Sequence, residues 1–310
     1  MVDLLSLLEE AGDKPLSGAV IGRRLGLTRA AVHKRIARLR AQGHLIEGAP
    51  RIGYLLKRHS DRPSSGDYKP GWGRPFHYFE TIPSTQDAAK LAAAQGTPEG
   101  ALFIAERQTA GRGRLGRRWD SPAGGLWYSL LLRPNLAPSA APGLALAAAL
   151  DWARLLEKSG LPARVKWPND VWIGRRKLGG ILTEMSSEAD RVQWVVLGIG
   201  VNVNNPVPKG LLTPGVSLKG AKGKNWSRAD LLSEWMARFA ETYAGYLKGG
   251  FPTIRKEFER LSLLRGRDAR FELEGRGVLG RVLGVDAEGR LRIRSGGREQ
   301  TISVGDVRPA

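Results

Sequence analysis

The chain has 310 residues, no cysteine and a formal net charge of +19 at pH 7. This length is typical of two or three domains, and the apolar fraction of 42% allows a buried core. Without cysteine there is no disulfide framework, thiol nucleophile or cysteine-bound metal, and the four histidines show no metal-ligand spacing, so the sequence leaves any metal site unknown. The N-terminus is acidic and is not followed by an apolar run of about 18 residues, so we expect a soluble cytoplasmic protein. The positive charge favours anionic partners, either nucleic acid or phosphorylated ligands.

Residues 17–43 have the pattern of a helix-turn-helix. Ser17 and Thr28 are suited to begin two helices, and Gly26 is suited to end the first. Residues 44–58 predict two strands about a Gly-Ala-Pro-Arg tip, which together form a wing. A winged helix-turn-helix indicates DNA binding, because its second helix enters the major groove.

The expected DNA contacts lie on the second helix and the wing. Arg29 and His33 are predicted to read bases, and Lys34 and Arg35 to bind phosphate. Arg51 at the wing tip is a further phosphate contact. The alternative is a structural three-helix module whose basic face is merely solvated.

The composition divides the chain into four predicted parts. Residues 1–60 form the DNA-binding domain, and residues 61–75 a linker rich in Pro, Gly and Ser. Residues 76–263 form a central domain of strands and helices. Residues 264–310 alternate apolar and polar residues between glycine turns, which predicts a small β-domain.

The central domain is expected to contain a mixed sheet. We predict strands at 76–80, 101–108, 126–134, three within 163–185, and one at 193–205 that breaks at Gly198 and Gly200. Helices are predicted from Ser84 to Gly96 and over 139–158, 226–249 and 252–263. Ser84 is expected to cap its helix in a capping box with Asp87, and residues 206–224 to form a mobile lid.

The central feature of the sequence is residues 111–118, Gly-Arg-Gly-Arg-Leu-Gly-Arg-Arg. Glycine allows close backbone approach to a ligand, and arginine offers a rigid fork of donors to carboxylate and phosphate. The segment lacks the Gly-Lys-Ser/Thr of a Walker A loop and the glycine spacing of a dinucleotide fingerprint. It therefore predicts a loop that wraps an anion, unless it is only a solvated hairpin tip.

Five motifs together resemble the bifunctional biotin–protein ligases that are also biotin operon repressors. They are Ser84-Thr85-Gln86, the run Gln108–Arg117, Lys166-Trp-Pro-Asn-Asp170, Arg176–Ile181 and Gly198-Ile-Gly-Val-Asn202. Their order and separations fit, and the resemblance covers nearly the whole chain. It implies an α+β protein with an N-terminal winged helix-turn-helix, a class II synthetase-like biotin/lipoate ligase domain with a mixed sheet, and a C-terminal SH3-like β-barrel.

The resemblance also implies a two-step reaction. Biotin and Mg-ATP give biotinyl-5′-AMP, and a lysine of the biotin carboxyl carrier domain of acetyl-CoA carboxylase then takes the biotinyl group. The adenylate-bound form is expected to dimerise and to repress biotin genes at operator DNA.

The resemblance assigns roles to particular residues. Catalysis falls to Lys177, Arg112, Arg114 and Asp170. Biotin binding falls to Ser84, Thr85, Gln86, Gln108, Arg112, Gly113, Arg114 and Lys177, and ATP binding to Arg114, Arg117, Lys166, Asn169 and Asn202. The sequence departs from the family pattern at Gln86, where asparagine is common, and at Leu211-Leu212, which stand where a lid aromatic is found.

Three other functions stay open. One is lipoate attachment, because lipoate ligases share the catalytic fold. The others are a ligase whose DNA-binding domain is vestigial and a non-catalytic repressor that senses biotinyl-adenylate. A thiol-dependent octanoyltransferase is excluded, because the chain has no cysteine nucleophile.

Overall fold

The computed structural model describes residues 3–41, 43–49, 52–58, 60–65, 68, 72–208, 210, 213–273, 276–303, 305 and 307–309. The chain divides into two compact units, one of residues 1–63 with 227–230 and one of residues 64–226 with 231–310. Within the described residues, no helix combines the length and apolar character needed to cross a membrane.

The first unit confirms the predicted helix-turn-helix. Its elements are α1 (Leu4–Glu10), α2 (Gly18–Leu25), α3 (Arg29–Ala41), β1 (Leu45–Ala49) and β2 (Gly53–Arg58). The Ser17 hydroxyl accepts a hydrogen bond from the Val20 N–H at 3.2 Å and begins α2. Gly26 ends α2 with a φ of +65°, a conformation that glycine adopts without strain. The Thr28 hydroxyl accepts from the Ala31 N–H at 3.2 Å at the start of α3.

The core of this unit explains which face of α3 is exposed. Val32 and Ile36 are buried one turn apart and pack with Leu4, Leu8, Ile21 and Ile46. β1 and β2 pair antiparallel as the predicted wing. The wing tip at Pro50-Arg51 lies outside the described residues.

A seven-stranded mixed sheet forms the centre of the second unit, in the order β3-β4-β5-β9-β8-β7-β6. Only β3 and β4 pair in parallel among these strands. The strands are β3 (Phe76–Ile82), β4 (Leu102–Gln108), β5 (Leu126–Leu132), β6 (Ala163–Lys166), β7 (Asp170–Ile173), β8 (Arg176–Glu188) and β9 (Arg191–Val201).

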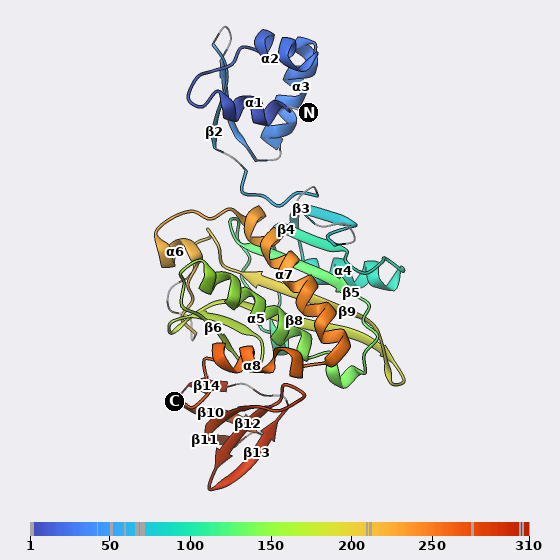
Figure 1. Cartoon of the computed structure of the whole chain (residues 1–310), viewed down its shortest axis with the longest axis vertical. Helices are drawn as coiled ribbons and strands as arrows, with labels where there is room; N and C mark the ends of the chain where they lie inside the picture. The colour runs from blue at the N-terminus through green and yellow to red at the C-terminus, as the bar shows by residue number, and fades with distance from the viewer. Residues whose placement is uncertain are drawn as a thin grey trace. The chain divides into compact units, whose positions relative to one another are not determined.

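Helices cover both faces of this sheet (Figure 1). They are α4 (Thr85–Ala94) on one face, and α5 (Gly143–Lys158), α7 (Arg228–Gly249) and α8 (Pro252–Leu261) on the other. Successive strand side chains point to opposite faces, and β5 shows this directly. Leu130 and Leu132 pack in the large cluster that contains α5, whereas Leu131 packs beneath α4 with Ala89 and Ala93.

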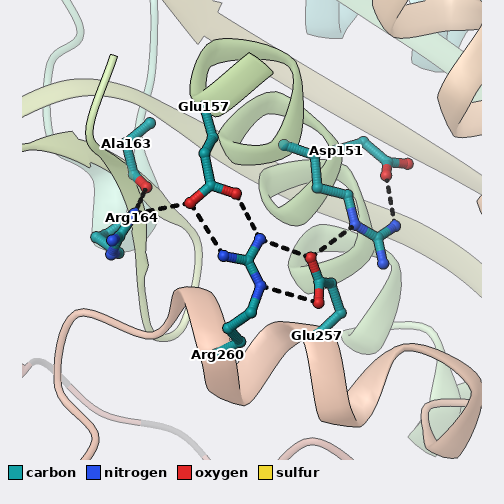
Figure 2. A network of polar contacts seen from close by, with 7 residues as sticks. Asp151, Glu157, Ala163, Arg164, Glu257 and Arg260 are labelled. Carbon is teal, nitrogen blue, oxygen red and sulfur yellow. Dashed lines mark hydrogen bonds and ion pairs between the residues drawn. The ribbon is translucent and has the colours of Figure 1, made fainter. Parts of the chain in front are cut away.

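A network of charges joins α5 to α8 (Figure 2). The Arg260 guanidinium donates to both carboxylate oxygens of Glu157, at 3.0 Å from Nη1, and to Glu257 at 2.7 Å from Nη2. Arg164 of β6 also reaches Glu157, at 3.4 Å. These hydrogen bonds hold the pKa of the Glu157 carboxyl below its usual value. The network ties α5 to α8 on the face of the sheet opposite α4.

The C-terminal β-domain is a five-stranded antiparallel sheet in the order β13-β12-β11-β10-β14. Its strands are β10 (Asp268–Leu273), β11 (Arg276–Val285), β12 (Leu291–Ser295), β13 (Arg298–Ile302) and β14 (Val307–Pro309). Two of the expected glycine turns occur at Glu288-Gly289 and Gly296-Gly297, while Glu274-Gly275 lies outside the described residues.

Two local predictions about the central domain were wrong. β9 does not break at Gly198 and Gly200 but pairs through both to Val201. Ser84 occupies the N-cap of α4 but makes no side-chain cap bond, and the Asp87 carboxylate pairs with Arg112 instead of completing a capping box. The expected lid, residues 206–224, contains a short helix α6 (Leu218–Lys222). Its Leu211-Leu212 lie outside the described residues.

Candidate active site

A cavity of about 540 Å³ opens in the second unit beside residues 111–118, here called the Arg/Gly loop, and the ends of several sheet strands. It collects twelve residues predicted for catalysis or substrate binding. They are Ser84, Thr85, Gln86, Gln108, Arg112, Gly113, Arg114, Arg117, Asn169, Asp170, Lys177 and Asn202. Lys166 is the one predicted member that does not line it. Lys166 is buried, with Nζ 5.2 Å from the centre of the Trp172 ring.

A row of hydrogen bonds crosses one wall of the cavity. Gln108 Oε1 accepts from the Thr85 N–H at 2.8 Å, and the Thr85 and Ser129 hydroxyls lie 2.9 Å apart. Ser129 Oγ donates to Gln86 Oε1 at 3.0 Å, and Gln86 Nε2 donates to the Val196 carbonyl at 3.1 Å. Thr85, Gln86 and Ser129 are each less than 5% exposed, so this row is shielded from water.

Each hydroxyl of the row carries only one proton to donate. Ser129 donates to Gln86 Oε1, and the Thr85 hydroxyl lies 2.9 Å from Ser129 Oγ and donates to Gln108 Oε1 at 3.1 Å. The Thr85 oxygen keeps free lone pairs as acceptors for a ligand. Gln108 Nε2 donates one hydrogen to Ser121 Oγ at 2.9 Å and keeps the other. The wall therefore presents both an acceptor and a donor.

Gln86 fits this wall because β9 has a glycine opposite it. A Cβ added at Gly198 would lie 2.3 Å from Gln86 Oε1. A Cβ added at Gly200 would similarly lie 2.6 Å from Trp119 Nε1. The two glycines, which the sequence suggested would break the strand, instead let side chains lie directly against it.

Lys177 brings a positive charge to the cavity. Its Nζ lies 2.7 Å from Asp170 Oδ1 and 5.2 Å from the centre of the Trp119 ring. The contact with Asp170 is a charge–charge contact rather than an aligned hydrogen bond, because Oδ1 accepts none of regular geometry within the described residues. The cation is thus held between a carboxylate and an aromatic face.

The loop arginines differ in how they are held. Arg112 donates to both carboxylate oxygens of Asp87. This pairing lowers the pKa of the Asp87 carboxyl and raises the pKa of Arg112. Arg114 reaches Asn169 Oδ1 and the Gly305 carbonyl, both at 3.4 Å. Arg117 is exposed on the same loop.

Asparagines line the other side of the cavity. Asn202 Oδ1 accepts from Asn205 Nδ2 at 2.8 Å, and Asn205 Oδ1 accepts from the Val203 N–H at 3.0 Å. Asn169 Nδ2 donates to the Ile181 carbonyl at 2.7 Å, which fixes the corner that carries Asp170. These side chains give the region after β9 a defined polar surface.

Sequence reasoning missed four residues of this site. Ser121 accepts a hydrogen bond from Gln108, and Ser129 joins Thr85 to Gln86. Asp87 accepts from Arg112, and Trp119 lies beside Lys177. Ser129 had a signal, because it is the one hydroxyl aimed at this wall from the otherwise apolar core strand β5, whose residues are all buried.

In the first unit, the predicted DNA contacts lie on the exposed side of α3. Arg29, His33, Lys34 and Arg35 are all exposed, while Val32 and Ile36 face the core. Arg51 lies outside the described residues.

Comparison with known protein families finds three matches along the chain. Residues 78–202 match the biotin/lipoate A/B protein ligase family, residues 2–55 an HTH domain, and residues 266–308 the biotin protein ligase C-terminal domain. The fold resembles a solved biotin protein ligase from Aquifex aeolicus in complex with biotin and ATP. That likeness has a TM-score of 0.66 and 29% identity over 75% of this chain and 98% of the other.

The fold and the site therefore define a protein ligase of the biotin/lipoate class joined to a helix-turn-helix domain. The chain is 36% identical to the bifunctional ligase/repressor BirA of Bacillus subtilis over 98% of its own length and 97% of the relative. It is 30% identical to the protein of that name in Escherichia coli over 91% of its length and 88% of the relative. The chain belongs to the family of bifunctional ligase/repressors.

Proposed function

We propose that this protein is an ATP-dependent biotin–protein ligase and a biotin-controlled repressor. In the first step, a biotin carboxylate oxygen attacks the α-phosphorus of ATP, which forms biotinyl-5′-AMP and releases pyrophosphate. In the second, a lysine amine of the biotin carboxyl carrier domain of acetyl-CoA carboxylase attacks the biotinyl carbonyl. AMP leaves, the amine loses a proton, and an amide is formed.

The hydrogen-bonded row from Gln108 to Gln86 is the observation that carries this proposal. The cyclic urea of biotin has one carbonyl acceptor and two N–H donors. The Thr85 oxygen offers an acceptor and Gln108 Nε2 a donor. Ser84, buried beside them without a cap bond, adds a hydroxyl. A buried wall of this polarity favours a neutral urea over an apolar ring, because an unmatched ligand would leave these groups unpaired.

Lys177 is the proposed catalytic cation. Charge builds on the carboxylate and the α-phosphate as the phosphorus becomes pentacoordinate, and a fixed ammonium stabilises that charge. The 2.7 Å contact with Asp170 supports a positioning role for this carboxylate, in addition to a proposed role in orienting the incoming lysine or the metal. Arg112, Gly113 and Arg114 on the loop are proposed to close over the adenylate, which keeps water from the mixed anhydride.

The proposed nucleotide contacts are Arg114, Arg117, Lys166, Asn169 and Asn202. We expect Mg²⁺ to arrive with ATP, because magnesium usually keeps several waters and takes only one or two protein carboxylates beside phosphate oxygens. The described residues fit this mode, since they contain no cluster of three potential metal ligands while Asp170 lines the cavity. The ion would offset the charge of the triphosphate.

The repressor half rests on the first unit. The exposed Arg29, His33, Lys34 and Arg35, with Arg51 at the wing tip, are proposed to bind operator DNA. The proposed boundaries are 1–60 for this domain, 61–75 for a linker, 76–263 for the ligase and 264–310 for the C-terminal domain. Ordering of the loop by the adenylate is proposed to promote a homodimer that binds the operator.

One incubation tests the enzyme. The purified protein is mixed with biotin, Mg-ATP and a biotin carrier domain, and the carrier is weighed as an intact molecule. A gain of one biotinyl group, with none when lipoate replaces biotin, is the expected result. Biotin binding without any gain would instead favour the non-catalytic sensor.

A separate footprinting experiment tests the repressor half. It uses genomic DNA with biotin and ATP present. Protection of a specific site is expected, and its absence would favour a vestigial DNA-binding domain.

A further inference from the structure

The acidic residue at the start of α4 controls one arginine of the Arg/Gly loop. Asp87 lies in the first turn of α4, and Arg112 begins the loop at residues 111–118. The two Nη atoms of Arg112 donate to the two carboxylate oxygens of Asp87, with Nη1 at 2.9 Å from Oδ2. Such paired bonds fix both the distance and the orientation of a guanidinium.

Asp87 is itself held from the opposite side. Lys90 Nζ lies 3.3 Å from Asp87 Oδ1 and donates to Glu184 Oε1 of β8 at 2.7 Å. The four side chains form a row of alternating charge, from Glu184 through Lys90 and Asp87 to Arg112. This row connects the loop to a helix and to a central strand of the sheet.

Two other arginines of the loop make side-chain contacts of a different kind. Arg114 reaches Asn169 Oδ1 and the Gly305 carbonyl at 3.4 Å, and Arg118 pairs at 3.0 Å with Asp120, which belongs to the same segment. The Asp87 pair therefore joins the start of the loop to a rigid element. The same helix carries Thr85 and Gln86 of the polar wall, so the pair also sets the distance between that wall and the loop.

We infer that Asp87 is a positioning residue that holds the closing loop through Arg112, and so governs how long the activated biotin stays bound. In this arrangement Arg112 acts as an anchor of the loop, and its charge is already balanced before any ligand binds. The inference rests on the proposed function, because it concerns the retention of biotinyl-5′-AMP.

A charge exchange tests this role. Biotinyl-adenylate is formed from labelled biotin and Mg-ATP on the full-length protein, and its release is followed after a chase with unlabelled biotin and ATP. Asp87→Asn is expected to release the adenylate about tenfold faster, the size of one lost charge-assisted contact. The double variant Asp87→Arg with Arg112→Asp, made in a Lys90→Ala background so that the new arginine does not face Lys90, restores the pair in reverse and is expected to bring release back to within about threefold of the rate of that background.

The exchange separates an anchor from a ligand contact. An Arg112 that bound the adenylate directly would not be replaced by an aspartate, so failure of the double variant to slow release would overturn the inference. Release at the original rate from Asp87→Asn would also overturn it. If the unchanged protein forms no biotinyl-adenylate at all, the proposed function itself fails, and the chase cannot start.

Hydrogen exchange separates positioning from simple unfolding. In Asp87→Asn, amides of residues 111–118 are expected to exchange faster while those of α4 keep their protection. Loss of protection along α4 as well would overturn the positioning role, because the carboxylate would then be needed for the helix itself. Glu299→Gln, which removes a carboxylate paired with Arg292 and Arg294 on the C-terminal sheet, is the matched control and is expected to leave adenylate release unchanged.

Discussion

Lys177 and Asp170 form an ion pair whose geometry is set by a β-hairpin. Asp170 begins β7 and Lys177 follows the start of β8, with a turn at Gly174-Arg175 between the two strands. The Lys177 Nζ consequently lies 2.7 Å from Asp170 Oδ1, and the two side chains are only 24% and 11% exposed. A cation held in this way is oriented before substrate arrives, which is the condition for effective electrostatic catalysis.

Replacing Lys177 tests the catalytic cation. Lys177→Ala is expected to slow adenylate formation by about 10²–10³-fold, the range found when one preorganised donor to a transition state is removed. Biotin binding is expected to survive in part, because the polar wall is untouched. Pyrophosphate release measures the first effect and direct biotin titration the second. Normal turnover would refute the role, and Lys158→Ala on the exposed part of α5 is the control.

Ser129 is predicted to determine biotin affinity without touching the nucleotide. Ser129→Ala removes the hydroxyl that contacts both Thr85 and Gln86, so these two side chains lose a partner that fixes their orientation at the wall. One lost hydrogen bond of about 1–1.5 kcal/mol raises the KM for biotin about tenfold and leaves the KM for ATP unchanged. Equal changes in both KM values would contradict this account. Ser159→Ala, at the end of α5, is the control.

Gly198 is predicted to be required for its lack of a side chain. Gly198→Ala places a Cβ 2.3 Å from Gln86 Oε1, which is itself hydrogen-bonded and buried. Overpacking of this kind costs about 1–3 kcal/mol. We expect titration calorimetry to show weaker biotin binding by this variant. Gly245→Ala in α7 meets no atom within 4 Å and is expected to stabilise the protein slightly. Unchanged biotin binding in Gly198→Ala would contradict this prediction, because it would show that the Gln86 side chain can move aside without weakening the site.

Lys34 is predicted to bind DNA phosphate. Lys34→Ala is expected to weaken binding to operator and to unrelated DNA alike, and to reduce the salt dependence of log K by about one unit. Fluorescence anisotropy over a series of salt concentrations measures both effects. The exposed Lys14, between α1 and α2, supplies the control variant Lys14→Ala. An unchanged salt slope would remove Lys34 from the interface.

The network behind the sheet is predicted to make stability depend on pH. Arg260 lowers the pKa of the Glu157 carboxyl below 4.5 in the folded protein, so its contribution is present above that pH and is lost as the pH falls through the lower, native value. Glu157→Gln is expected to reduce the free energy of unfolding by about 1 kcal/mol at pH 7, a value discounted for partial exposure. Urea unfolding followed by tryptophan fluorescence reports on the second unit, which holds all nine tryptophans. A difference between the two proteins that persists in full at pH 3 would contradict this cause.

Local sequence signals located most of the fold, because caps, turns and apolar periodicity are short-range properties. Ser17, Gly26 and Thr28 delimit the helices of the first unit as predicted. The site residues from 84 to 202 were predicted from motif resemblance, and the structure brings all but Lys166 to one cavity.

Long-range pairings were not predictable in this way. The sequence could not show that Asp87 faces Arg112 rather than the N–H groups of its own helix, because the two are 25 positions apart. It also gave no sign that Gln86 lies against Gly198, 112 positions further on, and so a strand break was predicted where a close contact exists. In both cases the residue type was informative, but its partner is set by the packing of the sheet.

The corner of residues 167–170 is fixed partly from outside the catalytic sheet. The Trp167 indole N–H donates to the Gly289 carbonyl at 3.0 Å, and Arg114 reaches the Gly305 carbonyl, both in the C-terminal domain. The backbone of that domain thus helps to set the shape of the cavity. Substitutions in its turns will therefore behave in assays as active-site variants, although they lie over a hundred residues along the chain from the chemistry.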